Sequence, residues 1–150
     1  MGDGRVSEIK RVLLASDLAE DARHVASRAR SVADAFGAEL HIIHVIEPFS
    51  LSYGGEIPMD LSSVQDQIHD QATAHLADLA GEFGIEEGCR HLVFGTPEVE
   101  IHKAAEEGEM DMIVVGTHGR HGIALLFGSQ STSVLHGATC DVLAVRVPDR

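Results

Sequence analysis

The sequence of 150 residues has few basic side chains, and this shortage limits what the protein can bind. It has 11 lysines and arginines against 24 aspartates and glutamates, which gives a formal net charge of −13 at pH 7. Nucleic-acid polymers need a basic protein surface to hold their phosphates, so we expect no such partner. A small phosphate ligand must be held by local dipoles and a few cations, against a repulsive overall field.

Cysteines are also scarce, and long apolar runs are lacking. Cys89 and Cys140 lie far apart in the sequence, each within a few residues of an apolar run. They indicate two small core thiols, with a disulfide or a metal pair as the alternative. No apolar run approaches the roughly 20 residues of a membrane span, and residues 1–5 lack the features of a secretory signal. We therefore expect a soluble, cytoplasmic protein with no membrane partner.

The sequence does contain enough apolar residues, 44% of the total, to bury one core. The apolar patterns predict strands at residues 11–16, 40–46, 90–95, 111–115 and 141–147. They predict helices at residues 19–36, 61–83, 97–107 and 129–136. Strands that alternate with helices and are apolar along nearly their whole length predict a parallel sheet with helices on both faces. We expect one α/β domain over residues 1–150.

Two predicted strand ends carry residues that suit a binding site. Asp17 follows the first strand and Gly116 follows the fourth. Parallel sheets bind ligands beyond the carboxyl ends of their strands, where the strand order reverses. If the first and fourth strands are neighbours, Asp17 and Gly116 face one crevice. The alternative role for Asp17 is the N-cap of the first helix.

The stretch "GTHGRHGIALLFGSQSTS", residues 116–133, is the second candidate feature. Gly116 and Gly119 lack a Cβ, so a phosphate could approach their backbone N–H groups closely. Gly128 and Ser129 precede the last predicted helix, whose start attracts anions. Polar side chains that could add donors or charge are Arg120, Ser129, Ser131 and Thr132. The stretch matches neither a Walker loop nor the dinucleotide fingerprint. Its glycines, hydroxyl groups and arginine predict an anion cradle, and the alternative is a simple turn.

Metal and enzyme chemistry find less support in the sequence. Cys89 and His91 lie two residues apart, but no matched second pair follows at a spacing typical of zinc sites. His41 and His44 should point to opposite faces of their strand. No partner acid, nucleophile elbow or activated thiol accompanies Asp17. We expect neither a metal site nor an enzyme, with weak nucleotide hydrolysis as the alternative.

Four segments resemble the universal stress protein family. "RVLLASDLAED" is similar to its first strand and acidic end, and "LHIIHVIEP" to its second strand. "DMIVVGTHGRHGIALLFGS" and "CDVLAVRVP" resemble its fourth strand, glycine loop and closing strand. The resemblance covers roughly residues 9–148. It implies an open five-stranded parallel sheet of order 3-2-1-4-5, of the adenine-nucleotide alpha hydrolase-like type, and a homodimer through residues 141–147.

The resemblance also implies roles for individual residues. Members that bind ATP carry a glycine, two residues, a second glycine, nine residues, and then Gly-Ser or Gly-Thr. Here eight residues separate Gly119 from Gly128, a shortening that resembles members regarded as not binding ATP. Carried over by position, Asp17 and Val45 would contact adenosine and Ala15 would line the base pocket. The residues that would face the phosphates are Gly116, Gly119, Gly128, Ser129 and Ser131. Arg120, the one certain cation in the loop, joins the candidate site on its charge and not through the resemblance.

The resemblance thus implies a stress-response sensor or switch that binds ATP or a related adenine nucleotide, with or without Mg²⁺. The alternative is a nucleotide-free dimer of the same fold that acts through protein partners.

Overall fold

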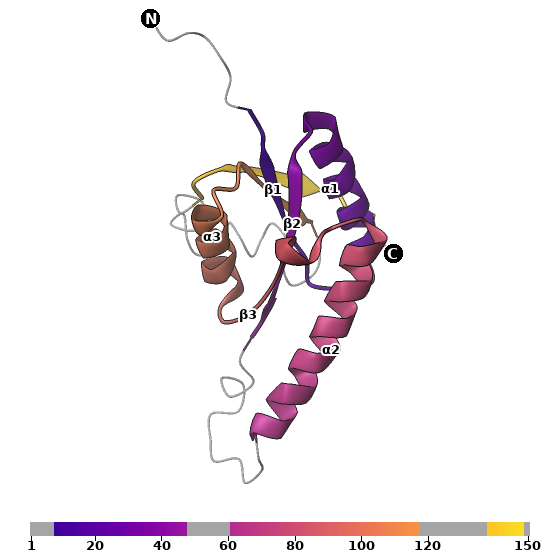
Figure 1. Cartoon of the computed structure of the whole chain (residues 1–150), viewed down its shortest axis with the longest axis vertical. Helices are drawn as coiled ribbons and strands as arrows, with labels where there is room; N and C mark the ends of the chain where they lie inside the picture. The colour runs from indigo at the N-terminus through magenta and orange to yellow at the C-terminus, as the bar shows by residue number, and fades with distance from the viewer. Residues whose placement is uncertain (1–7, 48–60, 118–137, 149–150) are drawn as a thin grey trace, which may run out of the picture.

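A computed structural model of the protein describes residues 8–47, 61–117 and 138–148. These residues form strands and helices in alternation (Figure 1). In chain order they are β1 (Arg11–Ala15), α1 (Ala22–Phe36), β2 (Glu39–Ile46), α2 (Leu61–Glu82), the 3₁₀ turn η2 (Glu87–Cys89), β3 (Arg90–Phe94), α3 (Pro97–Glu107), β4 (Met112–Gly116) and β5 (Asp141–Val145). All five predicted strands and the first three predicted helices are confirmed. The helix predicted at residues 129–136 lies outside the described residues.

The strands form one open parallel sheet in the order β3-β2-β1-β4-β5, as predicted. β1 lies at the centre, where Leu13 pairs with His41 of β2 on one side and Ile113 of β4 on the other. The chain adds β2 and β3 on one side of β1 and then returns to add β4 and β5 on the other. The strand order therefore reverses between β1 and β4, which confirms that these two strands are neighbours.

Helices cover both faces of the sheet, which Figure 1 shows with α1 and α2 on one side and α3 on the other. Leu14 belongs to the core beneath α1 and α2, whereas its neighbour Leu13 belongs to the core beneath α3. This alternation is expected because successive strand side chains point to opposite faces. Both side chains are fully buried, and burial on this scale contributes about 1.5–3 kcal/mol for each.

α1 packs closely on the sheet because its buried face consists mainly of small residues. That face carries Ala22, Val25, Ala26, Ala29 and Ala33. The helix ends at Gly37, which has a φ of 65° and donates its N–H to the Asp34 carbonyl. Left-handed backbone of this kind favours glycine at a helix end. The helix therefore stops in time for β2 to begin at Glu39.

Both cysteines are free thiols. Cys89 is buried, and Cys140 is half-buried where it precedes β5. The prediction of separate thiols is therefore confirmed, although only Cys89 lies fully in the core. No helix within the described ranges is long and apolar enough to cross a membrane.

Candidate functional site

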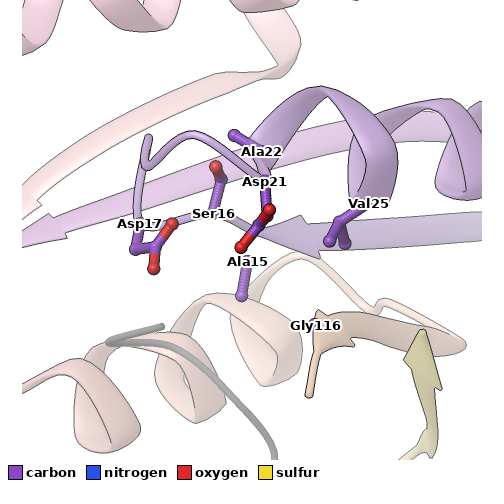
Figure 2. Close-up of a pocket in the computed structure, with 7 residues that line it drawn as sticks. All are labelled: Ala15, Ser16, Asp17, Asp21, Ala22, Val25 and Gly116. Carbon is purple, nitrogen blue, oxygen red and sulfur yellow. The ribbon is translucent and has the colours of Figure 1, made fainter. Parts of the chain in front are cut away.

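The carboxyl ends of β1 and β4 border a small hollow beside the start of α1 (Figure 2). Its described lining consists of Ala15, Ser16, Asp17, Asp21, Ala22, Val25 and Gly116. The prediction that Asp17 and Gly116 face one crevice is confirmed, and Ala15 lies there with them. The hollow measures about 20 Å³, so these residues alone form a corner of a site rather than a complete nucleotide pocket. We call it the β1–β4 corner.

Ser16 anchors the chain where it leaves β1. Its side chain is buried, its Oγ accepts the Leu18 N–H at 3.1 Å, and its own N–H donates to the Ile43 carbonyl at 3.0 Å. The Nδ1 of His44 lies 2.8 Å from the Ser16 carbonyl oxygen. Only a protonated ring nitrogen can donate to a carbonyl, so this contact requires the proton on Nδ1. β2 therefore holds the turn that follows β1.

Asp17 shapes the same turn rather than the helix. Its Oδ1 accepts the N–H of Ala19 at 2.9 Å, which is an Asx turn. α1 begins only at Ala22, with Asp21 in the N-cap position. The alternative in which Asp17 caps the first helix is therefore wrong. Leu18, with a φ of 58°, completes a tight turn that separates Asp17 from the helix start.

The described part of the corner is acidic. Asp17 and Asp21 both border the hollow, and its described lining holds no lysine, arginine or histidine. Carboxylates accept hydrogen bonds from hydroxyl and N–H groups and repel phosphates. The β1 side of the corner therefore suits a sugar or a base better than a phosphate. Gly116, on the β4 side, presents backbone without a side chain (Figure 2).

Val45 lies near the corner but does not line it. The residue as a whole is 3% exposed, and its side chain belongs to the core beneath α3. Its backbone is better placed. The carbonyl of Ile43 accepts a hydrogen bond from the β1 side, and backbone directions alternate along a strand. The N–H and C=O of Val45 therefore also face the β1 side, at a level where β1 has already ended.

Thr117 fastens the end of β4 to the end of β5. Its N–H donates to the Val145 carbonyl at 3.0 Å, and its Oγ1 accepts the Val147 N–H at 3.0 Å. Together with Ser16 and His44, it is one of the positioning residues that the sequence analysis missed. A sequence pattern could have identified Ser16 and Thr117, because each is a hydroxyl residue directly after a buried strand.

The other residues predicted for the site belong to the glycine stretch that follows β4 in the sequence. Gly119, Arg120, Gly128, Ser129 and Ser131 lie outside the described residues. Their role toward phosphates stays a prediction, as does the effect of the short spacer between the second and third glycines.

Comparison with known proteins identifies the family. Residues 8–146 match the universal stress protein family. Universal stress protein A homolog 1 of Coxiella burnetii is 37% identical over 137 residues, which cover 91% of this chain and 95% of the relative. This confirms the resemblance seen in the sequence.

Solved structures share the fold at lower identity. Hypothetical protein MJ0577 matches with a TM-score of 0.74 and 21% identity, over 96% of this chain and 100% of that one. A universal stress protein in complex with cAMP matches with a TM-score of 0.63 and 24% identity, over 93% and 98% of the two chains. With the sequence matches, the sheet order and the helices on both faces in agreement, this chain belongs to the universal stress protein family.

Proposed function

We propose that this protein binds ATP or a related adenine nucleotide at the β1–β4 corner and acts as a cytoplasmic sensor or switch in a stress response. The observation that carries the proposal is the meeting of Asp17 and Gly116 where the strand order reverses. Open parallel sheets bind ligands at this point. A solved structure of the same fold holds cAMP, which supports an adenine nucleotide as the ligand class.

The corner suggests how the nucleotide is oriented. The Asp17 carboxylate would accept hydrogen bonds from ribose hydroxyls, next to Ala15 and the base. The backbone N–H and C=O of Val45 would recognise the edge of the base, because a base offers both acceptors and donors. Since Asp17 and Asp21 repel phosphate, the phosphates would lie on the Gly116 side.

On that side we propose that the glycine stretch provides the anion contacts. The residues proposed to face the phosphates are Gly116, Gly119, Arg120, Gly128, Ser129 and Ser131. The eight-residue spacer between Gly119 and Gly128 would hold the helix start away from the terminal phosphate. We therefore expect a modest affinity for ATP and only a small preference for ATP over AMP.

The chemistry of the corner favours binding over turnover. Its described lining offers the carboxylates of Asp17 and Asp21 but no histidine, lysine or cysteine. A carboxylate could activate water, but a hydrolase would also need cations that stabilise the transferred phosphoryl group, and the described lining supplies none. We accordingly propose a binding protein rather than an enzyme.

A second candidate is a nucleotide-free dimer that acts through protein partners. β5 favours the dimer, because it lies at a sheet edge with Val142, Leu143 and Ala144 only half-buried. An edge strand of this kind can pair with the same strand of a second copy about a two-fold axis.

Calorimetric titration with ATP, AMP and cAMP, each with and without Mg²⁺, tests the proposal. Saturable binding of at least one nucleotide below millimolar concentration is the expected result. If no nucleotide binds at millimolar concentration, the corner is only a turn and the dimeric interaction protein replaces the sensor. If ATP is preferred over AMP only when Mg²⁺ is present, the ion binds together with the phosphates of ATP.

A further inference from the structure

A second group of chemically active side chains meets at the amino end of the sheet. Because Ile42 of β2 pairs with Arg90 of β3, the start of β2 lies beside the residue that leads into β3. Glu39, His41 and Cys89 thereby come together, and one donor atom of each lies within 4.8 Å of the others. We call these three residues the amino-end cluster. It lies at the opposite end of the strands from Asp17.

The donor set of the amino-end cluster suits a zinc-like ion. Thiolate sulfur, imidazole nitrogen and carboxylate oxygen are all zinc ligands. A Cys89 thiolate and a Glu39 carboxylate together would balance the charge of one divalent ion. Magnesium and calcium prefer sites made only of oxygen, so this set disfavours them.

The cluster is partly sheltered from solvent but remains accessible. Cys89 is buried, and the His41 side chain is 12% exposed. His41 also lines a hollow of about 390 Å³ on the α3 face, and Glu39 is open to solvent with a side chain that is 56% exposed. The Nε2 of His41 and an oxygen of Glu39 are 2.5 Å apart. Ligands of a tetrahedral ion with bonds of about 2 Å lie roughly 3.3 Å apart, so Glu39 must retreat slightly, and its 56% exposed side chain is able to do so.

His91 orients the histidine of the cluster. The Nδ1 of His41 lies 3.2 Å from the Nε2 of His91. The two rings are stacked, with centroids 5.4 Å apart and planes inclined by 11°. When Nε2 of His41 binds an ion, Nδ1 carries the proton and can donate it in a hydrogen bond to His91. Histidine ligands of metals usually have such a partner on the second nitrogen.

We propose that Glu39, His41 and Cys89 bind one divalent ion of the zinc class, with His91 as a positioning residue. On binding, the Cys89 thiol releases its proton to solvent and its sulfur forms the bond to the metal. Three protein ligands leave the fourth tetrahedral position to water or to an incoming ligand. Neither the ion nor its site depends on nucleotide at the β1–β4 corner.

Titration of the full chain with Co²⁺ tests the site, because a bound thiolate gives a sulfur-to-cobalt charge-transfer absorption. We expect this band to saturate at one equivalent. It should be lost in Cys89→Ser and retained in Cys140→Ser, the matched control at the other thiol. Zn²⁺ should abolish the band at stoichiometric amounts, whereas millimolar Mg²⁺ should leave it unchanged. A wild-type chain without the band, or a band that survives Cys89→Ser, overturns the proposal.

Two further measurements separate metal binding from folding. His91→Gln should keep the band but weaken Co²⁺ affinity about 10–100-fold, the usual effect of losing such a partner. His75→Gln, an exposed histidine on α2, should leave the affinity unchanged. In the wild-type chain, Zn²⁺ should slow alkylation of Cys89 at least tenfold without slowing that of Cys140. Equal alkylation of Cys89 with and without Zn²⁺ contradicts the site even if Cys89→Ser fails to fold.

Discussion

At the carboxyl end of the sheet, Asp17 and Asp21 border a hollow beside the bare backbone of Gly116. At the amino end, Glu39 and His41 meet the thiol of Cys89. The first end offers oxygen acceptors and backbone groups. The second offers softer sulfur and nitrogen donors. Beside them, burial together with the neighbouring His41 lowers the pKa of His91, which favours the neutral form of that ring. One sheet thus presents two different chemistries at its two ends.

Chain direction explains part of this difference. In a parallel α/β domain, helices start near the carboxyl ends of the strands and finish near the amino ends. α1 accordingly begins at Ala22, beside the β1–β4 corner, and ends at Phe36, shortly before Glu39. A helix start carries partial positive charge and a helix end partial negative charge. The backbone itself therefore favours anionic ligands at one end and cations at the other.

The largest effect on stability should come from β1, the central strand of the sheet. Leu13, at the centre of β1, is fully buried beneath α3. Leu13→Ala should lower the free energy of unfolding by about 2–5 kcal/mol, because it removes buried methyl groups and leaves a cavity. Urea denaturation measures the change. Val99→Ala, at a 56% exposed position, should stay within about 0.5 kcal/mol of the wild type. A comparable loss in both variants would contradict the placement of Leu13 in the core.

A smaller effect, confined to the carboxyl end, is expected from Asp17→Asn. The asparagine oxygen can still accept the Ala19 N–H, so the turn should persist. Losing a charged acceptor should weaken nucleotide binding by about 1.5–3 kcal/mol, or roughly 10–150-fold. Calorimetry with ATP measures this, and Asp66→Asn on the exposed face of α2 is the control. Co²⁺ affinity at the amino end should not change; a change there would show that the two ends are coupled.

The sheet edge provides the next test. Val145 turns its backbone groups toward β4, so those of Ala144 point outward. Ala144→Pro removes an outward N–H while sparing the pairing with β4, and edge strands tolerate proline. If β5 pairs with a second copy, two symmetric hydrogen bonds are lost and dimerisation should weaken about tenfold. Sedimentation at micromolar concentration measures this, with Ala144→Ser as the control. A monomeric wild type would exclude the proposed dimer.

The last test leaves fold and binding unchanged and concerns the second thiol at the amino end. Burial, helped by the carboxylates of Asp141 and Asp111, raises the pKa of Cys140 to about 11. Only the thiolate reacts with iodoacetamide. Alkylation of Cys140 should therefore be slow at pH 7, rise about tenfold for each pH unit, and level off only near pH 11. A plateau near pH 9 would show that the Cys140 thiol keeps an ordinary pKa and is more exposed than the structure indicates.

The strands and the first three helices were predictable because each is encoded locally. Val12 to Ala15 form an unbroken apolar run, and the apolar residues of α1 recur at spacings of three and four. The meeting of Asp17 with Gly116 was also predictable, since chain order and the switch-point rule bring those strand ends together.

What sequence could not reveal depends on turn geometry and on register. Asp17 was a reasonable helix cap by residue type, but the positive φ of Leu18 delays the helix start. The side chain of Val45 faces the core, and only its backbone points toward the corner. Cys89 joins Glu39 and His41 because of the pairing of Ile42 with Arg90. No local spacing encodes that pairing.

The hydrogen bonds between β2 and the turn after β1 constrain the order in which these parts of the chain can fold. The Ser16 carbonyl meets His44 and the Ser16 N–H meets the Ile43 carbonyl, so the turn cannot reach its final form until β2 has docked. A nascent or partly unfolded chain that lacks this docking has no formed corner. A nucleotide that binds at the corner, as proposed above, would then bind only to fully folded molecules and raise their population by mass action. In a cell, the level of free nucleotide would thereby influence how long each copy of the protein survives proteolysis.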